Sequence, residues 1–385
     1  MLKGEQNMNK LQALKIMMIG IIACLFAVPA VAAEPILIGN VAGFTGTYAA
    51  MSKDVKDAAD MAIKEINDGG GLLGRKLEQV AEDDENAPAI ATRKMEGLIL
   101  QKKVDFTMGT ISSAATLAMM QVAQKYNKIL MVPVSQSEKI TGESKNKVTF
   151  RTCANPGITS GALTNYMLNK LGKKIYLLTV DYAWGRSTSQ VYHKLLKEKG
   201  ATIVGETFFP LGNKDFAPYF GSVKAAKPDV LFITAAGNDA LSVVSQLDQY
   251  GIKKLMKVCG DGSLVAADVL PAMGQTANDI LTADYYAASL NTPENKAWAA
   301  KYKKMFGRDP SKFSVSSYEA VMWLAQAIKA AKSIETDAVV KALEGSTYRG
   351  PQGVKKMDPN SHQTSLDVYM IRIEKGNAVM FEKAN

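Results

Sequence analysis

The chain has 385 residues, of which 47% are hydrophobic, and a formal net charge of +9. This length indicates two domains rather than one core, and the balance of hydrophobic and charged residues excludes a disordered chain. The lysines stand singly beside acidic residues, without a basic block interleaved with aromatic side chains, so the composition argues against a nucleic-acid partner.

The first 33 residues have the organisation of a secretory signal peptide. Two lysines precede an apolar run, 16–28, and the small-residue stretch PAVAA follows it, as expected for a cleavable leader. The run is too short for a membrane-spanning helix. We expect cleavage after Ala32 or Ala33 and a periplasmic mature protein. The stretch IIAC resembles a lipoprotein box, so anchoring through a lipidated Cys24 is the alternative.

The mature chain opens with alternating strand and helix patterns. Strands are expected at 35–41, 77–81, from 104 to the break at Gly109, 128–134 and 148–151, with helices from 52, at 89–101 and after Ser113. Short loops between them favour parallel βαβ units and an open α/β sheet. The acidic run EDDE at 82–85 is expected to be a solvated loop rather than a cation site.

A second alternation begins after residue 151. Helices are expected at 159–171 and 188–199, and strands at 174–180, 202–208, 228–235 and 257–260. Two successive alternations indicate two similar lobes. The last third is less regular, with a strand at 279–286, helices at 294–305, 316–331 and 337–343, a polar loop at 350–365 and a final hairpin of 366–373 with 378–381.

Catalytic and metal-dependent functions lack the residues that they need. The mature chain has two histidines: His193 is expected on a solvated helix face and His362 in the polar loop. There is no Gly-x-Ser-x-Gly elbow, no metal-ligand spacing, no dinucleotide fingerprint and no phosphate-binding loop pattern. Cys153 and Cys259 are interpreted as two buried free thiols, with a single bridge between them as the alternative. The sequence therefore predicts neither an enzyme nor a cofactor.

The expected strands end in loops of similar composition. These loops are GTISSAAT, SQS, DYAW, AAGND and GDGS. In open α/β sheets, ligands bind outside the carboxyl ends of the strands, and small hydroxylated and aromatic residues can line a partly apolar pocket. At 104–116 a strand, a tight loop and a helix start follow one another, so the free backbone N–H groups there could hold a carboxylate or a phosphate. Capping of the helix by the same serines is the alternative.

Several stretches, in order, resemble the periplasmic solute-binding proteins of ABC importers, in the branched-chain amino-acid (Leu/Ile/Val) binding group. They include IGNVAGFTGTYA, GGGLLGRKLE, EDDENAP, GTISSAAT, MVPVSQSEKIT, FRTCANP, DYAWGRS, KPDVLF and GPQGVKKMDPNSHQ. The resemblance covers residues 34–385. It implies a type I periplasmic-binding fold, in which two Rossmann-like α/β lobes, with parallel sheets flanked by helices, are joined by three hinge crossings near 151–153, 280–284 and 350–365.

The resemblance also implies a domain division and a function. The signal peptide would be 1–33, the first lobe 34–151 plus 283–350, and the second lobe 152–282 plus 351–385. The protein would be a non-enzymatic carrier that closes around a small molecule and delivers it to an ABC permease in the inner membrane. An amino acid, branched-chain or related, held by its carboxylate is the first expectation. An aromatic acid, an amide or urea, taken up or sensed, is the alternative.

Ligand-binding roles carry over from the family to individual positions. Ser113 matches a carboxylate-binding serine, and the loop 135–137 matches one that grips the carboxylate and the ammonium. Tyr48 and Trp184 match aromatic residues of the two lobes, and Asp261 matches an acidic partner of the ammonium. With Ser112, which the hydroxyl cluster at the same helix start adds, the expected set is Tyr48, Ser112, Ser113, Ser135, Gln136, Ser137, Trp184 and Asp261. Packing or helix capping is the alternative for Tyr48, Trp184 and Asp261.

One departure from the family bears on the ligand. Leucine-binding members carry a tyrosine near the loop AAGN, where this chain has Ala235, Ala236 and Gly237. The resemblance therefore implies more room on that side of the pocket, which would admit an aromatic or bulkier carboxylate.

Overall fold

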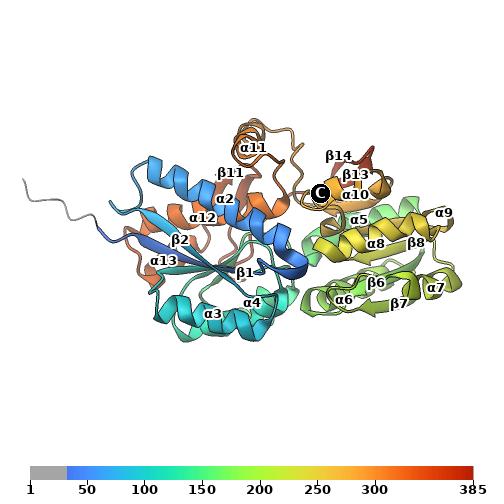
Figure 1. Cartoon of the computed structure of the whole chain (residues 1–385), viewed down its shortest axis with the longest axis horizontal. Helices are drawn as coiled ribbons and strands as arrows, with labels where there is room; N and C mark the ends of the chain where they lie inside the picture. Colours follow the sequence, from blue (N-terminus) through green and yellow to red (C-terminus); the bar gives the residue numbers. More distant parts are fainter. Residues whose placement is uncertain (1–32, 385) are drawn as a thin grey trace, which may run out of the picture. The chain divides into compact units, whose positions relative to one another are not determined.

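The computed structural model describes residues 33–384, and the compact unit considered below begins at Pro35 (Figure 1). The expected signal peptide, its cleavage after Ala32 or Ala33 and the alternative lipidation at Cys24 lie outside or at the edge of the described residues. Among the helices of the described part, none is both long enough and apolar enough to cross a membrane.

A five-stranded parallel sheet forms the centre of the first lobe. Its strands are ordered β2-β1-β3-β4-β5. They are β1 (Ile36–Ala42), β2 (Leu77–Asp83), β3 (Phe106–Gly109), β4 (Leu130–Val132) and β5 (Thr149–Arg151). Strands β1, β3, β4 and β5 are almost wholly buried, because a parallel sheet covered by helices on both faces has no solvated side.

Helices from two distant parts of the chain cover this sheet. Those that connect its strands are α2 (Ala49–Asp68), α3 (Pro88–Leu100) and α4 (Ser113–Lys125), and later in the chain come α11 (Pro293–Phe306), α12 (Lys312–Ala331) and α13 (Thr336–Leu343). Figure 1 shows α12 beside α2 on one side of the sheet and α3 beside α4 on the other. The hairpin β11 (Thr347–Gly350) and β12 (Gly353–Lys356) follows α13.

A seven-stranded mixed sheet forms the centre of the second lobe. Its order is β14-β13-β10-β9-β8-β6-β7. The strands are β6 (Lys174–Val180), β7 (Thr202–Phe209), β8 (Val230–Thr234), β9 (Lys257–Asp261), β10 (Leu281–Asp284), β13 (Val368–Glu374) and β14 (Asn377–Ala384). Strands β6 to β10 are parallel, whereas β13 and β14 pair antiparallel at one edge. The expected parallel sheets and the final hairpin are thus confirmed.

Helices also flank the second sheet. They are α5 (Pro156–Lys170), α6 (Ala183–Glu198), α7 (Ala217–Ala226), α8 (Gly237–Gln249) and the short α9 (Ile252–Leu255). The short α10 (Leu270–Met273) packs against one of them, α8. Side chains of α5 and α6 pack on one face of this sheet, against alternate strand residues that include Ile175, Leu177 and Phe232. The other face of the same strands joins the larger core cluster, as the two-residue period of a strand requires.

Three connections join the two sheets, and hydrogen bonds tie them together. They are the segments 152–155, 285–292 and 357–367. Gln363 donates to Cys153 O (2.8 Å) and accepts from Arg151 Nε (2.6 Å), so the first and third connections are bonded side by side. Gln352 donates to Tyr285 O (3.4 Å) beside the second connection. When the lobes open or close, they must therefore rotate about these hydrogen-bonded segments.

Several expectations from the sequence are wrong in detail. The second connection follows Asp284 instead of occupying 280–284, because β10 stays paired with β9 and β13. The loop expected at 350–365 contains β12. In the acidic run, Glu82 and Asp83 belong to β2 and Asp84 is fully buried, accepting a bond from Thr110, so a wholly solvated loop is ruled out.

The histidines and cysteines also have defined environments. His193 is half-exposed on α6, as expected. His362 is buried, stacked on Phe150 with ring centroids 4.1 Å apart. Cys153 and Cys259 are both free and buried, so the interpretation as buried thiols is confirmed. The lobe boundaries given above stay a prediction.

Candidate functional site

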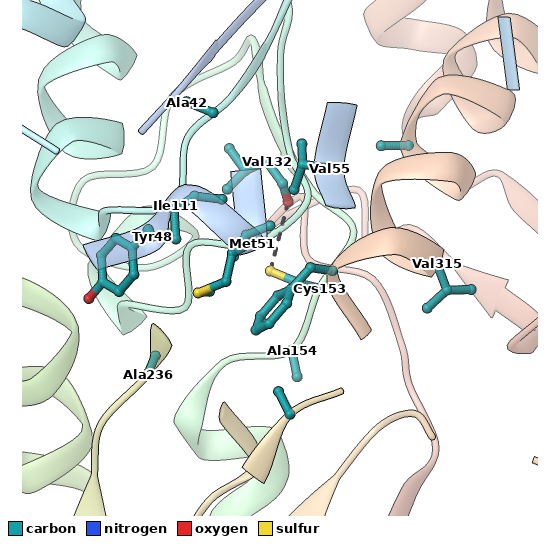
Figure 2. Packing of buried hydrophobic residues seen from close by; sticks show 14 of the residues in the cluster. Ala42, Tyr48, Met51, Val55, Ile111, Val132, Cys153, Ala154, Ala236 and Val315 are labelled. Atoms are coloured by element: carbon teal, nitrogen blue, oxygen red, sulfur yellow. Dashed lines mark hydrogen bonds between the residues drawn. The ribbon is translucent and has the colours of Figure 1, made fainter. Parts of the chain in front are cut away.

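A small cavity lies where loops of the two lobes meet at the carboxyl ends of their strands. Its volume is about 20 Å³, and it is lined by Tyr48, Met51, Ile111, Ser113, Val134, Gln136, Tyr182, Trp184, Ala236, Ser263 and Phe313. Figure 2 shows Tyr48, Met51 and Ile111 of the first lobe gathered opposite Ala236 of the second. A space of this size holds about one water molecule, so a small-molecule ligand can enter only if the lobes move apart.

Four of the eight expected site residues line this cavity. They are Tyr48, Ser113, Gln136 and Trp184. The other four, Ser112, Ser135, Ser137 and Asp261, are buried close by but are not among the lining residues. Their bonds within the protein show what each of them does in this conformation.

Ser112 and Ser113 have different roles at the start of α4. Ser112 is the N-cap residue, and its Oγ accepts from Ala115 N (3.4 Å). Ser113 is the first helical residue, and its Oγ accepts from Ser137 N (3.2 Å). A hydroxyl that accepts one bond can still donate its hydrogen. Because Ser113 lines the cavity, it can donate to a carboxylate placed there.

Gly109 sets the direction of the chain just before these serines. Its φ of +132° is a region that favours glycine, and a Cβ atom would lie 1.9 Å from Val41 O of the neighbouring strand. Only glycine permits such a close approach of two backbones. The break at the end of β3 therefore has a steric reason, and it leads directly into the start of α4.

Ser135 and Ser137 shape the loop that follows β4. Ser135 Oγ bonds to Thr116 Oγ1 (2.5 Å) and to Thr110 O (2.6 Å), and Ser137 Oγ accepts from Lys139 N (3.4 Å). The guanidinium of buried Arg151 donates to Ser137 O (2.6 Å). These bonds hold Gln136, which lies between the two serines, against the cavity.

Two tyrosines close one side of the cavity across the lobes. The hydroxyl of Tyr48, in the turn before α2, donates to the hydroxyl of Tyr182, in the loop after β6, over 2.8 Å. Burial raises the pKa of both phenols well above the ordinary value. Asp239 lies near both rings, and burial raises its pKa to about 7, although Gly212 N donates to its carboxylate (3.0 Å).

Trp184 contributes an indole ring from the first turn of α6. The side chain is 4% exposed, and its Nε1 has no hydrogen-bond partner among the residues that the structure describes. The sequence placed Trp184 in a loop and began the helix at 188, whereas α6 begins at Ala183. Phe313 faces the cavity from the first turn of α12, which begins at Lys312 and not at the expected 316.

Asp261 has a structural role in this conformation. Its Oδ1 accepts from Ser263 N (2.7 Å) and so caps the short helical turn that follows β9. Ser263 lines the cavity in its place. The alternative of a cap, which the sequence left open, describes the observed geometry.

In this conformation the loop AAGN lies against backbone of the opposite lobe, and the extra room that the resemblance implied for a bound ligand stays a prediction. Ala236 lines the cavity, and Gly237, with a φ of +56°, begins α8. A Cβ atom on Gly237 would lie 2.3 Å from Thr47 O. Because Ala236 and Gly237 are small, the first-lobe loop before Tyr48 can approach them closely. Its backbone then fills the space beside the loop AAGN.

A larger cavity of about 710 Å³ has Gly262 and Lys312 in its lining, the sequence neighbours of Ser263 and Phe313 in the lining of the small cavity. Residues of both lobes line it. Buried Lys312, from α12, bonds there to Asp284 at the end of β10 (3.0 Å). The pair links the two lobes next to Phe313. Among the described residues, no group of His, Cys, Asp and Glu side chains could hold a metal ion.

Several lining residues were not predicted as site residues. Tyr182 and Ser263 stand in the loops DYAW and GDGS, so their position at strand ends could have indicated them. Met51, Ile111, Val134 and Phe313 are apolar and resemble core residues in the sequence. Nothing in a local pattern distinguishes a side chain that faces a cavity from one that faces a core.

The chain matches the family model described as "Periplasmic binding protein" over residues 35–378. Leu/Ile/Val-binding protein homolog 6 of Brucella melitensis is 24% identical over 358 residues, which are 91% of this chain and 90% of that protein. The match thus extends over nearly the whole of both chains.

Solved structures with the same two-lobe fold include proteins with different ligands. A solute binding protein of an ABC transporter from Rhodopseudomonas palustris BisB5, in complex with 3,4-dihydroxybenzoic acid, is 28% identical with a TM-score of 0.85, over 91% of this chain and 97% of that one. A leucine binding protein from Thermotoga maritima is 20% identical with a TM-score of 0.82, over 91% and 99%. At 20% identity the likeness concerns the fold alone.

Proposed function

We propose that this chain, which belongs to the branched-chain amino-acid group of the periplasmic binding protein family, captures a small carboxylate without an ammonium group. An aromatic acid is the class that fits best. The loaded protein would deliver it to an ABC permease of the inner membrane. The signal-peptide pattern of residues 1–33 supports a periplasmic location for the mature protein.

The observation that carries the proposal is the absence of an acidic side chain from the cavity lining within residues 33–384. An α-ammonium group taken out of water needs a charged or strongly accepting partner. Asp261, which the family resemblance gave this role, is not among the lining residues, and its Oδ1 accepts from Ser263 N. A carboxylate alone needs only donors, and Ser113 supplies a hydroxyl at the start of α4.

The rest of the lining supports a flat apolar body on the ligand. Tyr48, Trp184 and Phe313 contribute aromatic rings, and Met51, Ile111 and Val134 contribute aliphatic or thioether surface. Such surfaces pack well against an aromatic ring. The 28% identical relative holds 3,4-dihydroxybenzoic acid, a ligand with a carboxylate and no ammonium group.

An amino acid, the first expectation from the sequence, is the second candidate. The Leu/Ile/Val-binding name of the Brucella relative favours it. If the lobes hold an amino acid, Asp261 must reach the ammonium, for which its second oxygen Oδ2 is available while Oδ1 accepts from Ser263 N. Loss of leucine binding in Asp261→Asn would then be expected.

A thermal-shift panel tests the proposal. It compares carboxylates without an amine (benzoate, 3-phenylpropanoate, 4-methylpentanoate), the α-amino acids leucine and phenylalanine, and the neutral benzamide. A ligand at 100 times its dissociation constant adds about 2.7 kcal/mol to the free energy of unfolding. We expect stabilisation by at least one simple carboxylate and none by benzamide. Stabilisation by amino acids alone would contradict the proposal.

A further inference from the structure

The indole N–H of Trp184 is a buried donor without a protein acceptor, on a side chain that lines the cavity. Trp184 lines the cavity and is 4% exposed, and its Nε1 has no partner within residues 33–384. Buried donors in native proteins are nearly always paired, and an unpaired one costs free energy of folding. A ligand that accepts from this N–H would remove that cost in the complex.

A second tryptophan also has a buried indole N–H without a partner, but it lies in a different part of the protein. Trp298 in α11 is also buried with an unpaired Nε1, but it packs among the rings of Tyr286, Tyr302 and Tyr318 and does not line the cavity. An unpaired indole N–H alone therefore does not indicate a ligand. The combination with a cavity between two lobes does.

A second donor lies beside Trp184. Tyr182 accepts from Tyr48 and can still donate its own hydroxyl hydrogen. The indole and phenol rings of Trp184 and Tyr182 are 6.1 Å apart between centroids. Ser113, which can donate to the carboxylate, belongs to the opposite lobe. Both lobes therefore contribute donors to the lining of the cavity.

We propose that Trp184 Nε1, helped by the Tyr182 hydroxyl, donates to an oxygen on the ligand at the end opposite the carboxylate. The protein then selects acids that carry a hydroxyl or carbonyl substituent over acids of the same size without one. This inference rests on the proposed function, because it assumes that the carboxylate lies against Ser113. Trp184 becomes the residue that determines specificity at the distal end of the ligand.

The test compares dissociation constants within pairs of ligands by calorimetry. The pairs are 4-hydroxybenzoate with 4-methylbenzoate and 3-hydroxybenzoate with 3-methylbenzoate, because a methyl group matches a hydroxyl in size and accepts no hydrogen bond. A net hydrogen bond corresponds to a preference of about 5- to 10-fold. We expect this preference for the hydroxy acid in at least one pair.

Trp184→Phe should bring that ratio to about one, because phenylalanine keeps a ring and removes the donor. Lost packing affects both members of a pair alike and cancels in the ratio. Trp298→Phe is the matched control, since it removes an unpaired indole N–H away from the cavity, and it should keep the wild-type ratio. A preference that persists in Trp184→Phe overturns the inference, and so does a wild-type ratio near one in both pairs.

A measurement on the wild-type protein covers the case in which Trp184→Phe fails to fold. The chain has three tryptophans, so its indole ¹⁵N–¹H spectrum has three signals. One of them should move further downfield with the hydroxy acid than with the methyl acid, and no differential shift would overturn the inference. Binding of methylbenzoates without a hydroxyl preference would contradict this inference alone, whereas binding of no aromatic acid would contradict the proposed function as well.

Discussion

At the scale of single residues, the structure holds several charges that are wholly enclosed and paired. Glu319 of α12 and Lys355 of β12 are 0% and 1% exposed and form an ion pair. Lys355 also donates to Thr152 O (3.4 Å) in the first connection, and Glu319 accepts from Gln352 N (3.0 Å). The pair therefore fastens the hairpin to the segments about which the lobes turn.

Removing one partner of this buried pair should be costly. Lys355→Met leaves Glu319 charged and unpaired in the interior, so we expect the free energy of unfolding to fall by about 3–5 kcal/mol, as for other buried pairs. Urea denaturation measures it. Lys383→Met is the control, because Lys383 and Asp367 are half-exposed and such pairs contribute less than about 1 kcal/mol. Equal losses in the two variants would contradict this account of the hinge.

At the scale of elements, the start of α4 joins helix capping and ligand binding in neighbouring serines. Ser112 caps the helix through Ala115 N, whereas Ser113 lines the cavity. Ser112→Ala should lower the free energy of unfolding by about 1 kcal/mol and leave ligand affinity within about twofold. Ser113→Ala should weaken carboxylate binding by about tenfold or more, since a bond to a charged group contributes about 1.5–3 kcal/mol.

Calorimetric titration and urea denaturation of both serine variants separate the two roles. The prediction fails if Ser112→Ala loses ligand affinity as strongly as Ser113→Ala. It also fails if Ser113→Ala binds the carboxylate as tightly as the wild type, which would move the anchor to another part of the cavity.

Strands were easier to predict than helix starts, for a physical reason. A strand such as β6 is a run of apolar residues that is buried on both faces, and this composition is visible in the sequence. Helix α12 begins instead with Lys312, whose partner Asp284 stands far away in the chain. Its capping box uses Ser311 and Ser314, without the glutamate or glutamine that usually marks one.

The site residues that could be predicted are those in family motifs at the ends of strands. Tyr48, Ser113, Gln136 and Trp184 were expected at the ligand and line the cavity, although their roles in binding stay a proposal. The cap that Asp261 places on Ser263 N is a local contact, which the sequence left open as an alternative, whereas the bond from Tyr48 to Tyr182 joins loops far apart in the chain. Bonds between distant loops leave no periodic pattern in a sequence, so only the three-dimensional arrangement reveals them.

At the scale of the whole molecule, three buried carboxyl groups tie stability to pH. Burial raises the pKa of Asp239 and of Asp268 to about 7 and that of Asp284 to about 6. Through these three groups the folded protein therefore binds more protons than the unfolded chain between about pH 4 and pH 7. Stability should fall as the pH rises through this range, because the folded state must then hold charges that it solvates poorly.

Asp268 offers a direct test of this dependence. Both of its carboxylate oxygens are buried and unpaired among the described residues. A pKa raised from 3.8 to about 7 corresponds to roughly 4 kcal/mol of stability lost between pH 4 and pH 8, as an order of magnitude. Asp268→Asn should flatten the profile of unfolding free energy against pH by a large part of that amount. An unchanged profile would show that Asp268 is not the group responsible.

The two lobes are proposed to capture a carboxylate and to offer no partner for an ammonium group. The most direct test is a calorimetric titration of the protein with 3-phenylpropanoate and with L-phenylalanine, which differ only by the α-ammonium. Burying an uncompensated ammonium costs several kcal/mol, so the account predicts that 3-phenylpropanoate binds at least about 100-fold more tightly. Equal affinity, or tighter binding of phenylalanine, would contradict it.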